Sequence, residues 1–244
     1  MAIASDFTPV FSNSHTIDFT QCMPNGYLKY TDLCNILQLT AAEHADKGGI
    51  SFSDMQQHHQ AWVLSRMRVE IVELPRWNDE VTVKTWIISL ENSRSVRALE
   101  MYVGQKKIVG CETFWAVFNT KIRRPEALAL PHSHFEKFPE VFSTNERVKK
   151  IELVSEITAV AEHLVQVSDL DIVNHVNNVK YLEWCLDAAG PSIALKRHIN
   201  SLDMNFLKEL VLGDSVVIKR LDAPGNCVFT VEKDKKVCFA LEIA

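Results

Sequence analysis

A dense run of polar residues stands between two apolar segments in the second half of the chain, at residues 168–178 (SDLDIVNHVNN). Asp171 and His175 carry side chains that can position water or transfer protons. If a helix begins after the run, its free N–H groups and its dipole would stabilise an oxyanion on an acyl carbonyl. The same residues are typical of a turn in which Asn177 or Asn178 caps the helix. Capping and catalysis are compatible, since one helix N-terminus can serve both.

The segments on either side of this run predict the elements that must position it. Apolar side chains recur at helical spacing over residues 178–195, although Pro191 argues against an unbroken helix to the end. Residues 157–167 are typical of a strand, and further strands are expected at residues 198–207, 215–221, 226–231 and 236–243. The polar run is therefore expected in a loop between a strand and a helix N-terminus.

The first half of the chain shows the same order of elements. Residues 30–47 have helical spacing that stops at Gly48 and Gly49, and strands are expected at residues 61–73, 80–90, 95–103 and 107–118. The peptide at residues 77–84 (WNDEVTVK) also resembles that at residues 212–219 (LGDSVVIK). Two copies of one unit, each an antiparallel sheet wrapped around a helix, explain this layout. We therefore predict an α+β fold with two tandem hot-dog domains, a double hot-dog.

A polar stretch with three prolines, residues 123–149, separates the two copies and is typical of a linker or a long crossing loop. We place an N-terminal domain at residues 1–130, a linker at residues 131–150 and a C-terminal domain at residues 151–244. The polar run then belongs to the C-terminal domain.

The overall composition argues against several classes of protein. The chain has 244 residues, a net charge of −5 and 47% hydrophobic residues, which is ordinary for a globular protein and disfavours general nucleic-acid binding. No apolar run approaches the roughly 18 residues that span a bilayer. Residues 1–14 lack the pattern of a secretory signal or a transit peptide, so we expect a cytoplasmic protein that binds no membrane. The six cysteines form no CxxC pair and are expected to be reduced and buried.

An ordered set of motifs resembles the acyl-ACP thioesterases of plant plastids and bacteria. Residues 169–181 (DLDIVNHVNNVKY), followed by Trp184, resemble the family signature D-L-D-x-N-x-H-V-N-N-x-x-Y. Residues 62–67 (WVLSRM), 75–81 (PRWNDEV), 114–119 (FWAVFN) and 123–125 (RRP) resemble motifs of the first domain. The resemblance covers about residues 15–240, and such an ordered set is much harder to meet by chance than any single motif.

The resemblance implies hydrolysis of the thioester of fatty acyl-acyl carrier protein, with release of a free fatty acid. It also implies that the C-terminal domain supplies catalysis while the N-terminal domain shapes the acyl pocket. Asp171 and His175 match the aspartate and histidine of the family. Residues 206–215 (FLKELVLGDS) resemble a family stretch Y-R-R-E-C-G-R-D-S, in which Glu209 matches the glutamate and one residue is inserted before Asp214.

Two positions depart from the family pattern. The active-site asparagine of the family falls on Val173 in an ungapped alignment, and Asn174 follows it. Either the loop is displaced by one residue so that Asn174 serves, or the role of the asparagine is lost. The cysteine once assigned as a nucleophile falls on Leu210, which excludes a Cys–His mechanism at that position.

The expected site combines these residues. Glu209 activates a water, Asp171 orients its surroundings, and His175 with the Asn174 amide holds the thioester or shares the proton transfer, although which carboxylate is the direct base stays open. Backbone amides of residues 176–178 are expected to receive the oxyanion. The expected substrate-binding residues are Asn177, Asn178, Leu33, Ile36 and Leu37, of which the last three suit core packing equally well. No cofactor and no metal are expected, because the pair His58–His59 lacks a third ligand.

Alternatives remain for the substrate and for the class of protein. An acyl-CoA thioesterase would use the same scaffold and chemistry, and a non-catalytic acyl-binding module is suggested by Val173. Basic residues that suit either contact with an acidic carrier protein or a solvated charge cluster are Arg66, Lys121, Arg123 and Arg124. A double hot-dog already contains the pairing that single hot-dogs obtain by dimerising, so we expect a monomer or a homodimer.

Overall fold

The computed structural model describes residues 3–153, 157–195 and 198–244. Over these residues, the first half contains β1 (Phe11–Thr16), α1 (Tyr30–Lys47), α2 (Phe52–Gln56), β2 (Gln60–Ile71), β3 (Glu80–Glu91), β4 (Arg94–Val103), β5 (Lys106–Asn119) and β6 (Arg124–Pro125). The second half contains β7 (Thr158–Leu164), α3 (Asn178–Ala189), α4 (Pro191–Ala194), β8 (Ser201–Phe206), β9 (Ser215–Ala223), β10 (Asn226–Lys233) and β11 (Lys236–Ile243). Single turns of 3-10 helix cover Phe19–Gln21 and Val167–Asp169.

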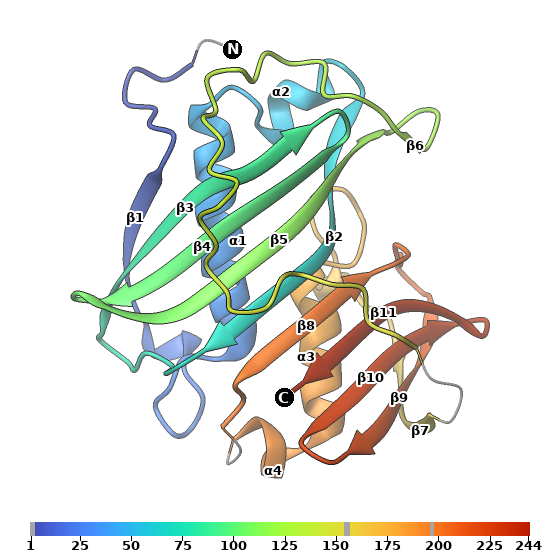
Figure 1. The fold of residues 1–244 in the computed structure, drawn as a ribbon. Helices are drawn as coiled ribbons and strands as arrows, with labels where there is room; N and C mark the ends of the chain where they lie inside the picture. Colours follow the sequence, from blue (N-terminus) through green and yellow to red (C-terminus); the bar gives the residue numbers. More distant parts are fainter. Residues whose placement is uncertain (1–2, 154–156, 196–197) are drawn as a thin grey trace.

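One antiparallel sheet runs through both halves, with α1 and α3 on the same face of it (Figure 1). Its strand order is β1-β3-β4-β5-β2-β8-β11-β10-β9-β7, with β6 paired to β5. The halves join where β2 pairs with β8, with Arg66 opposite Asn205 at one end of the register. Apolar side chains of both helices belong to one continuous core. Each half is thus an antiparallel sheet wrapped around a helix, which confirms the predicted double hot-dog.

Most elements expected from the sequence are present. The helix predicted over residues 30–47 is α1, with the same ends. The helix predicted over residues 178–195 stops at Ala189, because Gly190 has a φ of 77° and Pro191 starts the separate helix α4. β1 and α2 were not expected, since a six-residue strand of mostly polar side chains and a five-residue helix give weak periodic signals.

The two halves also share the turns suggested by the resemblance of residues 77–84 to residues 212–219. The Asp79 carboxylate accepts a hydrogen bond from the Arg76 amide at 2.7 Å, and the Asp214 carboxylate accepts one from the Val211 amide at 3.1 Å. The same kind of turn therefore leads into β3 and into β9, as expected for two copies of one unit.

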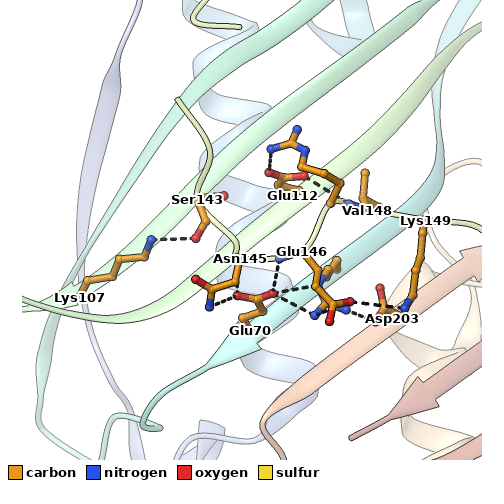
Figure 2. A network of polar contacts seen from close by, with 11 residues as sticks. Glu70, Lys107, Glu112, Ser143, Asn145, Glu146, Val148, Lys149 and Asp203 are labelled. Atoms are coloured by element: carbon orange, nitrogen blue, oxygen red, sulfur yellow. Dashed lines mark hydrogen bonds and ion pairs between the residues drawn. The ribbon is translucent and has the colours of Figure 1, made fainter. Parts of the chain in front are cut away.

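After residues 126–135 have passed the end of α1 beside α2, residues 137–150 cross the face of the sheet opposite α1 and α3 (Figure 1). Figure 2 shows how the last part of this crossing, residues 143–150, is fastened by charged groups. Arg68 of β2 pairs with Asp203 of β8 and lies 2.9 Å from Glu70, which in turn accepts hydrogen bonds from the backbone amides of residues 145 and 146. Glu112 of β5 is fully buried and pairs with Arg147. These groups tie the crossing segment to β2 and β5 of the first half, and the Asn205 side chain of β8 ties it to the second half by donating to the Lys149 carbonyl at 3.1 Å.

Candidate active site

The polar run folds into a tight turn whose centre is the Asp171 carboxylate. This carboxylate accepts hydrogen bonds from the amides of Val173 at 2.9 Å and His175 at 3.2 Å, while the Asp171 amide donates to the His175 carbonyl at 2.8 Å. A bridge between Leu170 and Val176 closes the turn. Asp171 therefore holds the backbone that carries His175.

Asn174 lies at the point of this turn where the backbone is left-handed, with a φ of 60°. In the first half, the loop closed by the bridge between Cys22 and Leu28 has the same length, and Gly26 occupies the equivalent position with a φ of 81°. Asparagine and glycine are the residues that tolerate this conformation best. The loop around Asn174 thus has the same length and left-handed position as its counterpart in the first half, and Val173 is 39% exposed. Which of Val173 and Asn174 takes the place of the family asparagine stays a prediction.

Two other residues of the signature stabilise the approach to the turn. The buried Asp169 carboxylate accepts hydrogen bonds from the Gln166 amide at 2.8 Å and from His163 at 2.9 Å. Although burial opposes its charge, these hydrogen bonds lower the pKa of Asp169. The His163 ring packs on Trp184 of α3, with 4.2 Å between ring centroids. Asp169 and Trp184 therefore act on the fold of the loop.

Glu209 follows β8 on a loop that is hydrogen-bonded to the polar run at residues 168–178. Leu210 is fully buried, and its carbonyl accepts a hydrogen bond from the Val176 amide at 2.9 Å. The Tyr181 hydroxyl of α3 is 3.5 Å from the carbonyl of the residue before Glu209. These contacts place a Glu209 carboxylate oxygen 3.6 Å from Nε2 of His175. The structure thus brings together two of the predicted catalytic side chains. The distance between them is slightly longer than that of a hydrogen bond, which is common in active sites before substrate binds.

Arg123 reaches this pair from the first half of the chain. It lies on the turn between β5 and β6 with a φ of 55°, and its Nη2 is 2.5 Å from the same oxygen of Glu209. The sequence suggested Arg123 only for carrier-protein contact or for a solvated cluster, and its meeting with Glu209 was not expected. The R-R-P motif was the available signal, since it marked Arg123 without indicating its partner.

The backbone amides at the start of α3 differ in whether they already donate a hydrogen bond within the protein. The Asn177 side chain caps the helix, as expected. The amides of Val176 and Asn177 already donate to the carbonyls of Leu210 and Asp169, at 2.9 and 2.8 Å. The expectation that these two amides receive an oxyanion is therefore wrong. In the described part of the chain, the Asn178 amide has no acceptor, and it points from the positive end of the α3 dipole.

A cavity in the first half adjoins the start of α3. The Asn178 side-chain amide donates to Gln38 of α1 at 3.1 Å, and Gln38 lines a cavity of about 210 Å³ between α1 and the sheet. Its wall is mostly apolar and includes Ala41, Ala45, Ile50, Ile87, Leu90 and Trp115. Leu33, Ile36 and Leu37 lie earlier on α1, are packed in the shared core, and do not line this cavity.

Other features of the sequence have simple structural positions. Five of the six cysteines are buried, as predicted, and Cys22 is partly buried. In the residues that the structure describes, no group of three His, Cys, Asp or Glu side chains could hold a metal ion. None of the helices in the described ranges has the length and apolar character needed to cross a membrane.

Two family models match the chain. One is described as the acyl-ACP thioesterase N-terminal domain and matches residues 8–130, and the other as the acyl-ACP thioesterase C-terminal domain and matches residues 154–241.

Curated relatives come from plants. The chain is 28% identical over 206 residues to a chloroplastic palmitoyl-acyl carrier protein thioesterase of Cuphea hookeriana, covering 78% of this chain and 48% of that protein. It is 27% identical over 226 residues to a chloroplastic dodecanoyl-[acyl-carrier-protein] hydrolase of Cinnamomum camphora, covering 85% of this chain and 58% of that protein. The chain therefore spans about half the length of these relatives.

Solved structures share the fold over nearly their whole length. A crystal structure of an acyl-ACP thioesterase from Bacteroides thetaiotaomicron has a TM-score of 0.89 and 23% identity, covering 96% of this chain and 97% of that chain. The 12:0-ACP thioesterase from Umbellularia californica has a TM-score of 0.80 and 20% identity, covering 97% of this chain and 96% of that chain. At these identities the likeness establishes the fold.

Proposed function

The chain belongs to the acyl-ACP thioesterase family, and from this premise we propose that it hydrolyses the thioester of a fatty acyl chain carried on acyl carrier protein. The observation that carries the proposal is the meeting of His175 and Glu209 beside the N-terminus of α3, which itself contacts the wall of an apolar cavity. This arrangement offers a place for the acyl chain, a group that takes a proton and a group that returns one.

The proposed reaction uses these groups in order. With the acyl chain in the cavity and the carbonyl at the start of α3, Glu209 accepts a proton from a water whose oxygen attacks the carbonyl carbon. The negative charge on the carbonyl oxygen is stabilised by the Asn178 amide and the helix dipole. When the carbon–sulfur bond breaks, His175 delivers a proton to the sulfur, and the products are a free fatty acid and the carrier-protein thiol. The proton that Glu209 took from water then passes to His175, which restores both groups for the next cycle. Arg123 holds Glu209 in place for this role.

Asp171 and Asn174 support this chemistry through the turn that carries His175. Asp171 is proposed to act by holding two backbone amides of that turn, which keeps the imidazole directed at Glu209. A direct role for Asn174, expected from the sequence, stays a prediction, and its left-handed backbone supports a role in shaping the turn.

The decisive experiment measures release of free thiol from a panel of acyl-acyl carrier proteins and the matching acyl-CoA esters. Wild type is compared with Glu209→Gln and His175→Ala, and with Glu183→Gln, a matched control on a half-exposed carboxylate of α3. We expect both site variants to lose roughly a hundredfold to ten-thousandfold in kcat, because each removes a proton-transfer group, and the control to keep wild-type turnover.

The possible outcomes distinguish the proposed function from its alternatives. Full turnover by Glu209→Gln would refute its assignment. Lower KM for CoA esters than for carrier-protein esters would identify an acyl-CoA thioesterase. Tight binding of acyl chains without turnover by wild type would identify an acyl-binding module, with Val173 at the family asparagine position as the first cause to test.

The acyl carrier protein as partner, a monomeric or homodimeric state, and a cytoplasmic location belong to this proposal. Arg66, Lys121 and Arg124 are the basic residues proposed for carrier-protein contact, since the partner is acidic. The salt dependence of KM tests this contact, because an electrostatic encounter weakens as ionic strength rises.

A further inference from the structure

A buried arginine forms part of the wall of the cavity beside α1. Arg97 of β4 is only 5% exposed, yet it lines the cavity together with apolar side chains such as Ile87 and Leu90. Charged groups are rarely buried unless a partner of opposite charge or a ligand compensates them. The partners of Arg97 therefore decide what this part of the cavity can bind.

Among the described residues, the groups that hydrogen-bond to Arg97 carry no negative charge. Its Nη1 donates to Nδ1 of His44 at 2.7 Å and to the Thr85 hydroxyl at 3.1 Å. Nε2 of His44 lies 3.0 Å from the Thr8 carbonyl, an acceptor, so Nε2 carries the proton and Nδ1 is free to accept. Burial and the charge of Arg97 lower the pKa of His44 to about 3, which keeps the imidazole neutral.

The guanidinium retains hydrogen-bonding capacity toward the cavity. A guanidinium has five N–H donors, and both hydrogen bonds to described residues leave from Nη1. The partners of Arg97 among the described residues are an imidazole and a hydroxyl and include no carboxylate. Burial lowers the pKa of Arg97 only to about 10, so the group keeps its positive charge at neutral pH. Part of an apolar cavity is therefore cationic and rich in donors.

This cationic part lies away from the proposed reaction centre. Gln38, which contacts α3, and His44, which contacts Arg97, are both on α1 and six residues apart. At 1.5 Å per residue, this separation is about 9 Å along the helix axis. A chain that enters beside Gln38 would thus meet the guanidinium several carbons beyond its thioester end.

We propose that Arg97 makes the far part of this cavity a binding site for an oxygen group, a carboxylate or a hydroxyl, carried by the acyl chain at a distance from the thioester. The substrate class is then a medium-length chain with an oxygenated far end, and the carboxylate is the better ligand because it pairs with the guanidinium charge. This inference rests on the proposed function for the presence of a thioester, but the binding site itself is independent of turnover.

The test is a calorimetric titration of the full chain with three free acids of equal carbon number: an unsubstituted fatty acid, its ω-hydroxy form and the α,ω-dicarboxylic acid. Wild type is compared with Arg97→Met and with Arg94→Met, a control on an exposed arginine of the same strand. We expect wild type and Arg94→Met to bind the dicarboxylic acid roughly ten to a hundred times more tightly than the unsubstituted acid. Arg97→Met is expected to lose this preference.

Equal or weaker binding of both oxygenated acids by wild type would overturn the inference, and so would a preference that survives in Arg97→Met. If that variant fails to fold, the ratio of affinities in wild type decides alone. Turnover of the corresponding thioesters separates the two proposals. Hydrolysis of unsubstituted chains without any preference for oxygenated acids defeats only the inference about Arg97. A retained preference without hydrolysis of any thioester defeats only the proposed function.

Discussion

Arg147→Ala is expected to destabilise the protein because it leaves a fully buried carboxylate without its partner. Glu112 is 0% exposed and pairs with Arg147 of the segment that crosses the sheet (Figure 2). Burial already raises the pKa of Glu112, and the charge of Arg147 opposes that rise. The guanidinium also lies over the Phe142 ring, with 3.7 Å to its centroid, so the substitution removes two contacts at once.

The size of the effect follows from the burial of the two partners. Breaking a buried ion pair by removing one side costs roughly 3–5 kcal/mol. Because the Arg147 side chain is 41% exposed, water can partly solvate the site it leaves, so the lower end of about 3 kcal/mol applies. For a chain of this size such a loss lowers Tm by roughly 6–12 °C.

Urea denaturation followed by circular dichroism measures this change. Lys149→Ala is the matched control, since Lys149 lies on the same segment and pairs with Glu146 at 3.4 Å between exposed side chains. This control is expected to cost less than about 0.5 kcal/mol. Adding Glu112→Gln to Arg147→Ala should recover at least about 1 kcal/mol, because the buried charge is then absent. Equal destabilisation by Arg147→Ala and Lys149→Ala would refute the reasoning.

Three further predictions concern the cavity and the site. The pKa of His44 is about 3 in the folded protein, below its ordinary value of 6.5, so its contribution to stability is complete above pH 6.5 and is lost as pH falls toward 3. His44→Gln should reduce the slope of unfolding free energy against pH by up to about 1.4 kcal/mol per unit between pH 6 and 4; an unchanged slope would contradict this. Arg123→Met should lower kcat by up to about fivefold, because the half-exposed pair with Glu209 is worth about 0.2–1 kcal/mol; Arg94→Met is the control, and equal kcat values for the two variants would show that Arg123 has no role in the site. Asn174→Gly should keep both stability and turnover, because Gly26 occupies the equivalent turn; a hundredfold loss of kcat in a stable variant would show that the amide acts in the reaction.

Local features of the fold were accessible from sequence because each depends on residues close together in the chain. The ends of α1 followed from side-chain spacing and from the glycines after it. The break at Gly190 followed from the proline that succeeds it. β1 and α2 escaped prediction because short elements with few apolar residues have no measurable period.

The candidate site was predicted in part. The motif placed Asp171, His175 and Glu209 in the second half, and the structure brings His175 within 3.6 Å of Glu209. It did not indicate that the Asp171 carboxylate accepts hydrogen bonds from amides of its own turn. An aspartate can serve in catalysis or in turn formation with the same side chain, so the motif does not distinguish the two roles. It also did not indicate that Asn174 is the residue of this turn with a left-handed φ, since several residue types can occupy such a position.

The sequence by itself determined the two repeated units, the order of their elements and the loop that carries the polar residues, because periodicity and turn chemistry act over a few neighbouring residues. Only the tertiary structure decided which distant residues meet. Arg123 and Glu209 are 86 positions apart, and Gln38 and Asn178 are 140 apart. Their contacts, and the exposure of Arg97 to a cavity, depend on how β2 pairs with β8 and how the helices pack on the shared sheet. Those distances are set by packing between elements, on which local spacing in the chain carries no information.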